Sequence, residues 1–115
     1  MRRAPLLLLL VLAVAVPACS GEAATATCDS PVATTQVELA DFEYRPACVE
    51  ASAGDTLTLT NSGSAPHTFT VSDTDLNANI DGGETGELPL GDLAAGTYAV
   101  HCTYHPQMTG ALKIV

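Results

Sequence analysis

The sequence predicts an all-β sandwich, and three observations support this fold class. Apolar residues alternate with polar ones at a two-residue spacing from residue 34 onward, threonine is frequent in the alternating segments, and Gly, Pro, Asn and Asp interrupt them at short intervals. This alternation is typical of strands with one face in a core and one face in water. No segment has a clear helical period, and no internal repeat indicates a second domain.

Each predicted strand follows from its own alternation. Residues 35–40 bring Val37 and Leu39 to one face, and residues 55–61 do the same with Leu57 and Leu59 while three threonines face outward. Three more strands are predicted in the same way. Residues 67–72 bring His67, Phe69 and Val71 inward. Residues 97–102 bring Tyr98, Val100 and Cys102 inward, and residues 110–115 bring Leu112 and Ile114 inward.

The N-terminus has the pattern of an export signal over residues 1–18. Arg2 and Arg3 precede an apolar run at residues 6–16 and the small-residue stretch "VPACSG". The apolar run is too short to cross a bilayer about 30 Å thick at about 1.5 Å per residue. "VPAC" resembles the lipobox of bacterial lipoproteins, which would make Cys19 a lipidated N-terminus; the alternative is cleavage after Ala26, which would release a soluble exported protein.

The segment between the signal and the predicted domain is small and polar. Residues 19–33 are expected to form a short tether from Cys19, and residues 34–115 the folded domain. Loss of Arg2 and Arg3 with the signal changes the formal charge from −9 to −11, because all 13 acidic residues lie after Cys19. Such a domain would repel phosphate backbones, which excludes nucleic acid as a partner.

The stretch "HCTYHPQM" at residues 101–108 concentrates metal-binding side chains. Cys102, His105 and Met108 follow one another at the spacing C-x2-H-x2-M, and His67 occupies an inward position on another predicted strand. Two imidazoles, a thiolate and a weak thioether are the donors of a blue-copper site. His101 is expected to point away from this cluster, because adjacent side chains of a strand face opposite sides.

The four cysteines separate by role. If Cys19 carries lipid and Cys102 binds metal, Cys28 and Cys48 remain, and outside the cytoplasm these two are expected to form a disulfide.

Several segments together resemble the cupredoxins, and specifically their amicyanin, pseudoazurin and plastocyanin-like branches. The similar segments are "VEASAGDTLTLTN", "NSGSAPHTF", "AGTYAVHCTYHPQM" and "GALKIV", so the resemblance covers about residues 34–115. It implies a Greek-key β-sandwich that holds one type 1 copper ion through His67, Cys102, His105 and Met108. It also implies a buried His67 and Cys102, with a His105 edge exposed in a patch of residues 65, 66, 106, 107 and 109.

Two positions depart from the family pattern. Thr68 stands where many members have an asparagine that ties the two ligand loops, and we expect Thr68 to bond to Thr103 instead. Tyr104 stands where amicyanin-type loops often have proline, so a backbone N–H is expected near the Cys102 sulfur.

The expected function is single-electron transfer between extracytoplasmic redox proteins by a monomer. Its acidic surface would attract a basic docking face. The alternative is a protein of the cell envelope that binds and delivers copper. An enzyme such as a nitrite reductase or multicopper oxidase is not expected, because the chain has no spare histidines for another copper centre. The expected location is the outer face of the cell membrane through lipid on Cys19, or the periplasm or exterior without it.

A second motif has a different interpretation. Residues 73–84, "DTDLNANIDGGE", place oxygen-bearing residues at positions of an EF-hand loop, but Ala78 stands where that loop needs glycine. The flanking segments are strand-like rather than helical, so an acidic surface loop is expected there instead of a calcium site.

Overall fold

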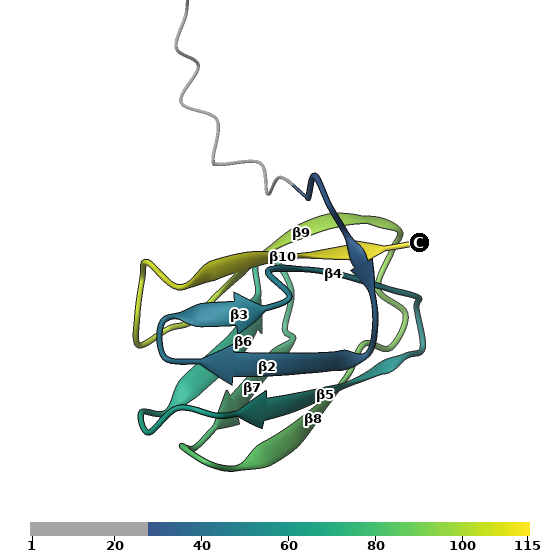
Figure 1. Ribbon diagram of the computed structural model, residues 1–115. Coiled ribbons are helices and arrows are strands. Elements are labelled where there is room, and N and C mark those ends of the chain that lie inside the picture. Colours follow the sequence, from purple (N-terminus) through teal and green to yellow (C-terminus); the bar gives the residue numbers. More distant parts are fainter. Residues whose placement is uncertain (1–27) are drawn as a thin grey trace, which may run out of the picture.

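A computed structural model describes residues 28–115, which form two β-sheets packed face to face (Figure 1). The ten strands are β1 (Val32–Ala33), β2 (Gln36–Ala40), β3 (Glu43–Arg45), β4 (Cys48–Ala51), β5 (Thr56–Asn61), β6 (His67–Val71), β7 (Asn77–Ile80), β8 (Thr85–Pro89), β9 (Gly96–His101) and β10 (Thr109–Ile114). Over these residues no helix is long and apolar enough to cross a membrane. The predicted all-β sandwich is confirmed.

The strand order places the start of β6 beside the end of β9. One sheet has the order β1-β4-β10-β9-β6-β7, and the other has the order β3-β2-β5-β8. In the first sheet, β6 is antiparallel to β9, and Thr70 is opposite His101. The residues just before Thr70 on β6 and just after His101 on β9 therefore meet at one end of the sandwich.

The core consists of the inward residues of both sheets, as the alternation predicts. β5 shows this most clearly, since Leu57 and Leu59 have no exposed surface while Thr56 and Thr60 are exposed. The fully buried side chains also include Leu39, Phe69, Val71, Val100 and Leu112. Removing these apolar surfaces from water is the main stabilising contribution to a domain of this size.

The five strands expected from alternation are all present, and five further strands were missed. β1 pairs in parallel with β4, so the sheet begins upstream of Thr34, where the sequence indicated a tether. A strand of two residues is too short to show alternation. The other missed strands have three to five residues each, so their alternation is also a weak signal.

The acidic segment at residues 73–84 differs in part from the surface loop that was expected. Its middle is strand β7, which pairs with β6 from Asn77 to Ile80, and Ile80 enters the core. Three of the four β7 residues are exposed or only partly buried, so the segment carries little periodic signal. The segment forms one strand of a hairpin with β6. It is therefore not the loop between two helices that an EF-hand requires.

A disulfide joins Cys28 to Cys48, the pairing that was expected. It links the segment before β1 to the first residue of β4, across a sequence separation of 20 residues. Closing a loop of this length stabilises a fold by roughly 3 kcal/mol in the chain-entropy model. The predicted export signal and the predicted lipidation of Cys19 lie outside the described residues.

Candidate metal centre

Three predicted ligands meet at one end of the sandwich. His67 is the first residue of β6, Cys102 directly follows β9, and His105 lies on the loop that leads to β10. The Cys102 Sγ atom is 3.9 Å from His67 Nδ1 and 3.6 Å from His105 Nδ1. One donor atom from each residue lies within 4.8 Å of the other two.

These distances fit a single metal ion between the three donors. For a divalent ion such as zinc, sulfur ligands lie at about 2.3 Å and imidazole nitrogens at about 2.0 Å, which puts two donors of a trigonal site about 3.8 Å apart. The observed nitrogen–sulfur separations of 3.9 and 3.6 Å bracket that value. The fourth predicted ligand, Met108, is fully buried on the same loop. Two imidazoles, a thiolate and a thioether form a donor set typical of a type 1 copper site.

The ligand loop is closed by hydrogen bonds between the ligands' own backbones. The N–H of His105 donates to the carbonyl of Cys102 at 3.3 Å, and the N–H of Met108 donates to the carbonyl of His105 at 2.9 Å. The N–H of Cys102 donates across the base of the loop to the carbonyl of Met108 at 3.1 Å. The chain therefore holds residues 102–108 in one shape by itself.

The Cys102 sulfur accepts a backbone hydrogen bond. The Thr68 N–H donates to it at 3.4 Å. The Tyr104 N–H, which was expected near the sulfur, acts on the thiol in the same direction by lowering its pKa. Burial raises the pKa of the Cys102 thiol, but these amides and the two imidazoles outweigh burial and lower the pKa to about 6. The site therefore favours the thiolate, which is the form that binds metals.

Thr68 links the two ligand segments. Its Oγ1 accepts a hydrogen bond from the Thr103 N–H at 2.9 Å, which confirms the bond expected from the sequence. The buried Tyr44 hydroxyl donates to the Thr68 carbonyl at 2.6 Å. Burial, followed by the nearby Cys102 thiolate, raises the pKa of Tyr44, so this hydroxyl stays protonated and remains a donor. Thr68 is thus fixed from both sides of the site.

His101 lies apart from the cluster, although it is next to Cys102 in the sequence. Its Nδ1 atom is 3.2 Å from the Ser72 hydroxyl, and its ring is half-buried against the sheet. The alternation of side chains along β9 explains the separation, because Cys102 faces inward and His101 faces the other side.

The surface around His105 combines apolar side chains with a partly exposed imidazole. His67 and Cys102 are buried, at 0% and 1% exposure, whereas His105 is intermediate. Pro66, Pro106, Gln107 and Thr109 are exposed and Ala65 is partly exposed, in agreement with the patch expected from the sequence. Two larger side chains on the described surface, Phe42 and Tyr104, are 54% and 50% exposed.

Sequence reasoning missed two residues that contact the imidazoles. Asp41 and Phe42 form the turn between β2 and β3. The Asp41 Oδ1 atom is 3.1 Å from His67 Nε2, and the Phe42 ring meets the His105 ring edge-on with centroids 5.0 Å apart. Phe42 has a φ of 68°, which is uncommon for a bulky residue and marks a conformation held by its surroundings. No motif in the sequence signals these contacts, because they depend on how the turn meets β6.

The chain is similar to known copper proteins in sequence and fold. A search of curated protein sequences gave no significant match. A purple cupredoxin from Nitrosopumilus maritimus is 23% identical, with a TM-score of 0.59 over 70% of this chain and 98% of that one, which shows the shared fold. The Cu(I) form of an amicyanin point mutant is 28% identical, with a TM-score of 0.58 over 73% of this chain and 86% of that one.

A larger copper protein contains a similar domain. A copper-containing nitrite reductase from Thermus scotoductus SA-01 is 20% identical, with a TM-score of 0.60. The match covers 81% of this chain but only 24% of the reductase, so the likeness is to one part of that protein's fold.

The sequence model of the cupredoxin-like domain family matches residues 6–114, which is nearly the whole sequence. The chain belongs to the cupredoxin-like domain family.

Proposed function

We propose that this protein is a type 1 copper electron carrier that passes single electrons between extracytoplasmic redox proteins. The observation that carries the proposal is the set of His67, Cys102 and His105 donor atoms within 4.8 Å of one another. The amicyanin structures it resembles include Cu(I), oxidized and reduced forms of that protein. Copper bound here would supply the one-electron Cu(I)/Cu(II) couple, with His67, Cys102, His105 and Met108 as its ligands.

The protein's own contribution is a site whose shape is set before any metal binds. The ligand loop is tied by three backbone hydrogen bonds, and Thr68 joins that loop to β6. A fixed arrangement of donors suits both oxidation states, so little has to rearrange when an electron moves. His105 provides the route to the surface, because it is the partly exposed member of the three-donor group.

The surface around His105 fits brief docking of a redox partner. Electron-transfer encounters use small interfaces, and an apolar patch with a polar border permits fast dissociation. The formal charge of −9 for the whole sequence would attract a partner with a basic docking face. We therefore propose that association slows as salt is added, because screening shortens the range of this attraction.

The alternative, delivery of copper to another protein, requires a site that opens and releases its ion. The buried His67 and Cys102 and the closed ligand loop favour retention instead. An enzymatic role has less support, because the similarity to nitrite reductase covers a quarter of that protein. We propose a location outside the cytoplasm, which agrees with the Cys28–Cys48 disulfide, since disulfides persist in oxidising compartments.

A visible absorption spectrum of the Cu(II)-loaded protein tests the proposal. An electron carrier is expected to show an intense thiolate-to-copper band that disappears with ascorbate and returns on reoxidation, with copper retained throughout. Weak colour, or copper that dissociates on reduction, would instead favour the delivery function.

Tyr104→Pro is expected to lower the reduction potential of the copper-loaded protein. Proline has no N–H, so the substitution removes the backbone amide of Tyr104 that stabilises the thiolate and leaves the sulfur more electron-rich, which favours Cu(II). Cyclic voltammetry measures the change.

Tyr104→Ala is the matched control for that substitution. It keeps the backbone N–H but removes the ring and the hydroxyl that accepts a hydrogen bond from Asn79. Its potential is expected to change less than that of Tyr104→Pro. Equal shifts in the two variants would show that the ring, and not the N–H, sets the potential.

A further inference from the structure

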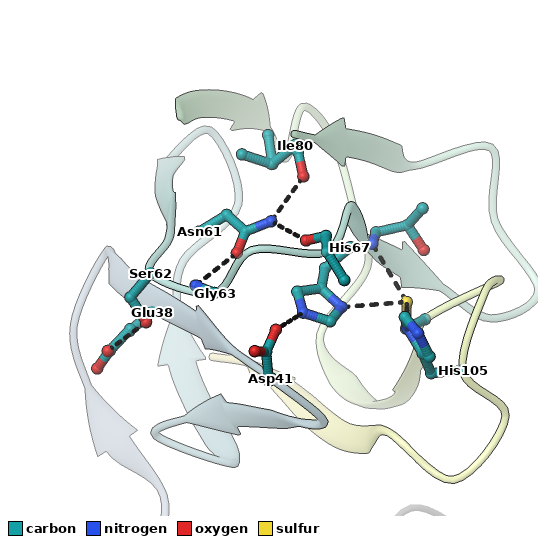
Figure 2. Close-up of polar contacts among 11 residues, drawn as sticks. Glu38, Asp41, Asn61, Ser62, Gly63, His67, Ile80 and His105 are labelled. Carbon is teal, nitrogen blue, oxygen red and sulfur yellow. Dashed lines mark hydrogen bonds and ion pairs between the residues drawn. The ribbon is translucent and has the colours of Figure 1, made fainter. Parts of the chain in front are cut away.

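The turn between β2 and β3 contacts His67 through the side chain of Asp41. Figure 2 shows the His67 ring between Asp41 on one side and the sulfur beside His105 on the other. His67 Nδ1 faces the sulfur and Nε2 faces the Asp41 carboxylate, at 3.9 and 3.1 Å. An ionised carboxylate only accepts hydrogen bonds, so Nε2 carries the proton and the Nδ1 lone pair is free for a metal.

Asp41 also packs against the segment that leads to His67. Its carboxylate lies against the backbone of Gly63, four residues before His67. One side chain thus contacts both the ring and the loop that carries the ring.

Gly63 makes room for this arrangement. A Cβ atom added at Gly63 would overlap the Asp41 carboxylate and come 3.3 Å from Asn61 Oδ1. Asn61 is buried, and it donates to the carbonyls of Ala65 and Ile80 at 2.8 and 2.9 Å while its Oδ1 accepts from the Gly63 N–H. The loop is therefore folded closely around the carboxylate (Figure 2).

We propose that Asp41 is a positioning residue of the metal centre, which fixes the tautomer and orientation of His67 and shifts the redox balance of bound copper toward Cu(II). The proposal rests on the proposed copper function. A carboxylate that accepts the second N–H of a ligating imidazole makes the imidazole a stronger donor, and stronger donation stabilises the more highly charged ion. The negative charge of Asp41 acts in the same direction.

Three substitutions separate the contributions of Asp41. Asp41→Asn removes the charge and keeps an acceptor oxygen, whereas Asp41→Ala removes both. Gly63→Ala keeps the charge nearby but displaces the carboxylate from its place, at a position where the backbone does not require glycine. Asp75→Asn is the control for loss of one negative charge, because Asp75 is exposed in the turn between β6 and β7, at the other end of β6 from His67.

The measurements are the reduction potential and the Cu(II) and Cu(I) affinities of each copper-loaded protein. Asp41→Ala is expected to weaken Cu(II) binding by about 10- to 100-fold, the usual effect of losing such a partner. If Cu(II) binding weakens tenfold more than Cu(I) binding, the reduction potential rises by about 59 mV. Asp41→Asn and Gly63→Ala are expected to raise the potential in the same direction, and Asp75→Asn to leave it unchanged.

NMR of the His67 ring in the metal-free protein gives a second readout. The wild type is expected to show the tautomer with its proton on Nε2, and Asp41→Ala to lose that preference. Potentials of Asp41→Ala and Asp75→Asn that agree, together with an unchanged tautomer, would overturn the proposal. A wild type without the intense copper band would overturn the proposed function instead, and the ring tautomer would still report on the Asp41 contact.

Discussion

Replacing Cys102 by serine is expected to abolish the intense visible absorption of the copper-loaded protein. The band requires a thiolate bound to copper, and Cys102 is the one cysteine outside the disulfide among the residues that the structure describes. A serine hydroxyl stays protonated at neutral pH and is a poor ligand for Cu(I). The same substitution should therefore weaken Cu(I) binding more than it weakens Cu(II) binding.

His101→Asn is the matched control for that experiment, because it changes the residue next to Cys102 without touching the three-donor group. His101 faces Ser72, and we expect the variant to keep both its colour and its copper. Absorption spectra and copper analysis of the two variants test whether the colour requires Cys102 and not His101. Colour in Cys102→Ser, or its loss in His101→Asn, would contradict the proposed ligand set.

The sequence was most informative where side-chain alternation is long and regular. The six residues of β5 alternate between buried side chains and side chains that are exposed or partly buried. The limits of this strand were predicted to within one residue. The short strands β3, β4 and β8 carry three to five residues each, and their pairing depends on partners far away in the sequence. Local periodicity cannot report such pairing, since the contacts that stabilise these strands are tertiary.

The metal centre could be predicted because its donors are chemically distinctive. A cysteine, a histidine and a methionine at fixed spacing are rare as a group, and strand alternation already placed His67 and Cys102 on inward faces. Asp41 could not be predicted in this way, because an aspartate in a turn is common and is usually solvated. Its contact with His67 depends on the approach of the β2–β3 turn to β6, which only the folded arrangement shows.

Phe69→Ala is expected to cause the largest loss of stability among single substitutions near the site. Phe69 is fully buried in the middle of β6, two residues after His67, and its ring meets the Tyr44 ring edge-on with centroids 5.5 Å apart. Removing a buried phenylalanine ring costs about 3–5 kcal/mol, through lost burial and the cavity left behind. That loss is a large part of the total for a domain this small, at about 0.05–0.15 kcal/mol per residue.

The second phenylalanine of the chain provides the control for Phe69→Ala. Phe42 is 54% exposed, so Phe42→Ala is expected to cost about 1 kcal/mol or less, mostly through its edge contact with His105. Urea unfolding of the metal-free proteins measures both values.

Copper at about 1,000 times its dissociation constant would add about 4 kcal/mol to the stability of either variant by linkage. Phe69→Ala should therefore regain stability on loading, because the cavity lies beneath the ligand strand and leaves the four donors in place. Failure of copper to restore it would mean that β6 cannot position His67 without the Phe69 ring.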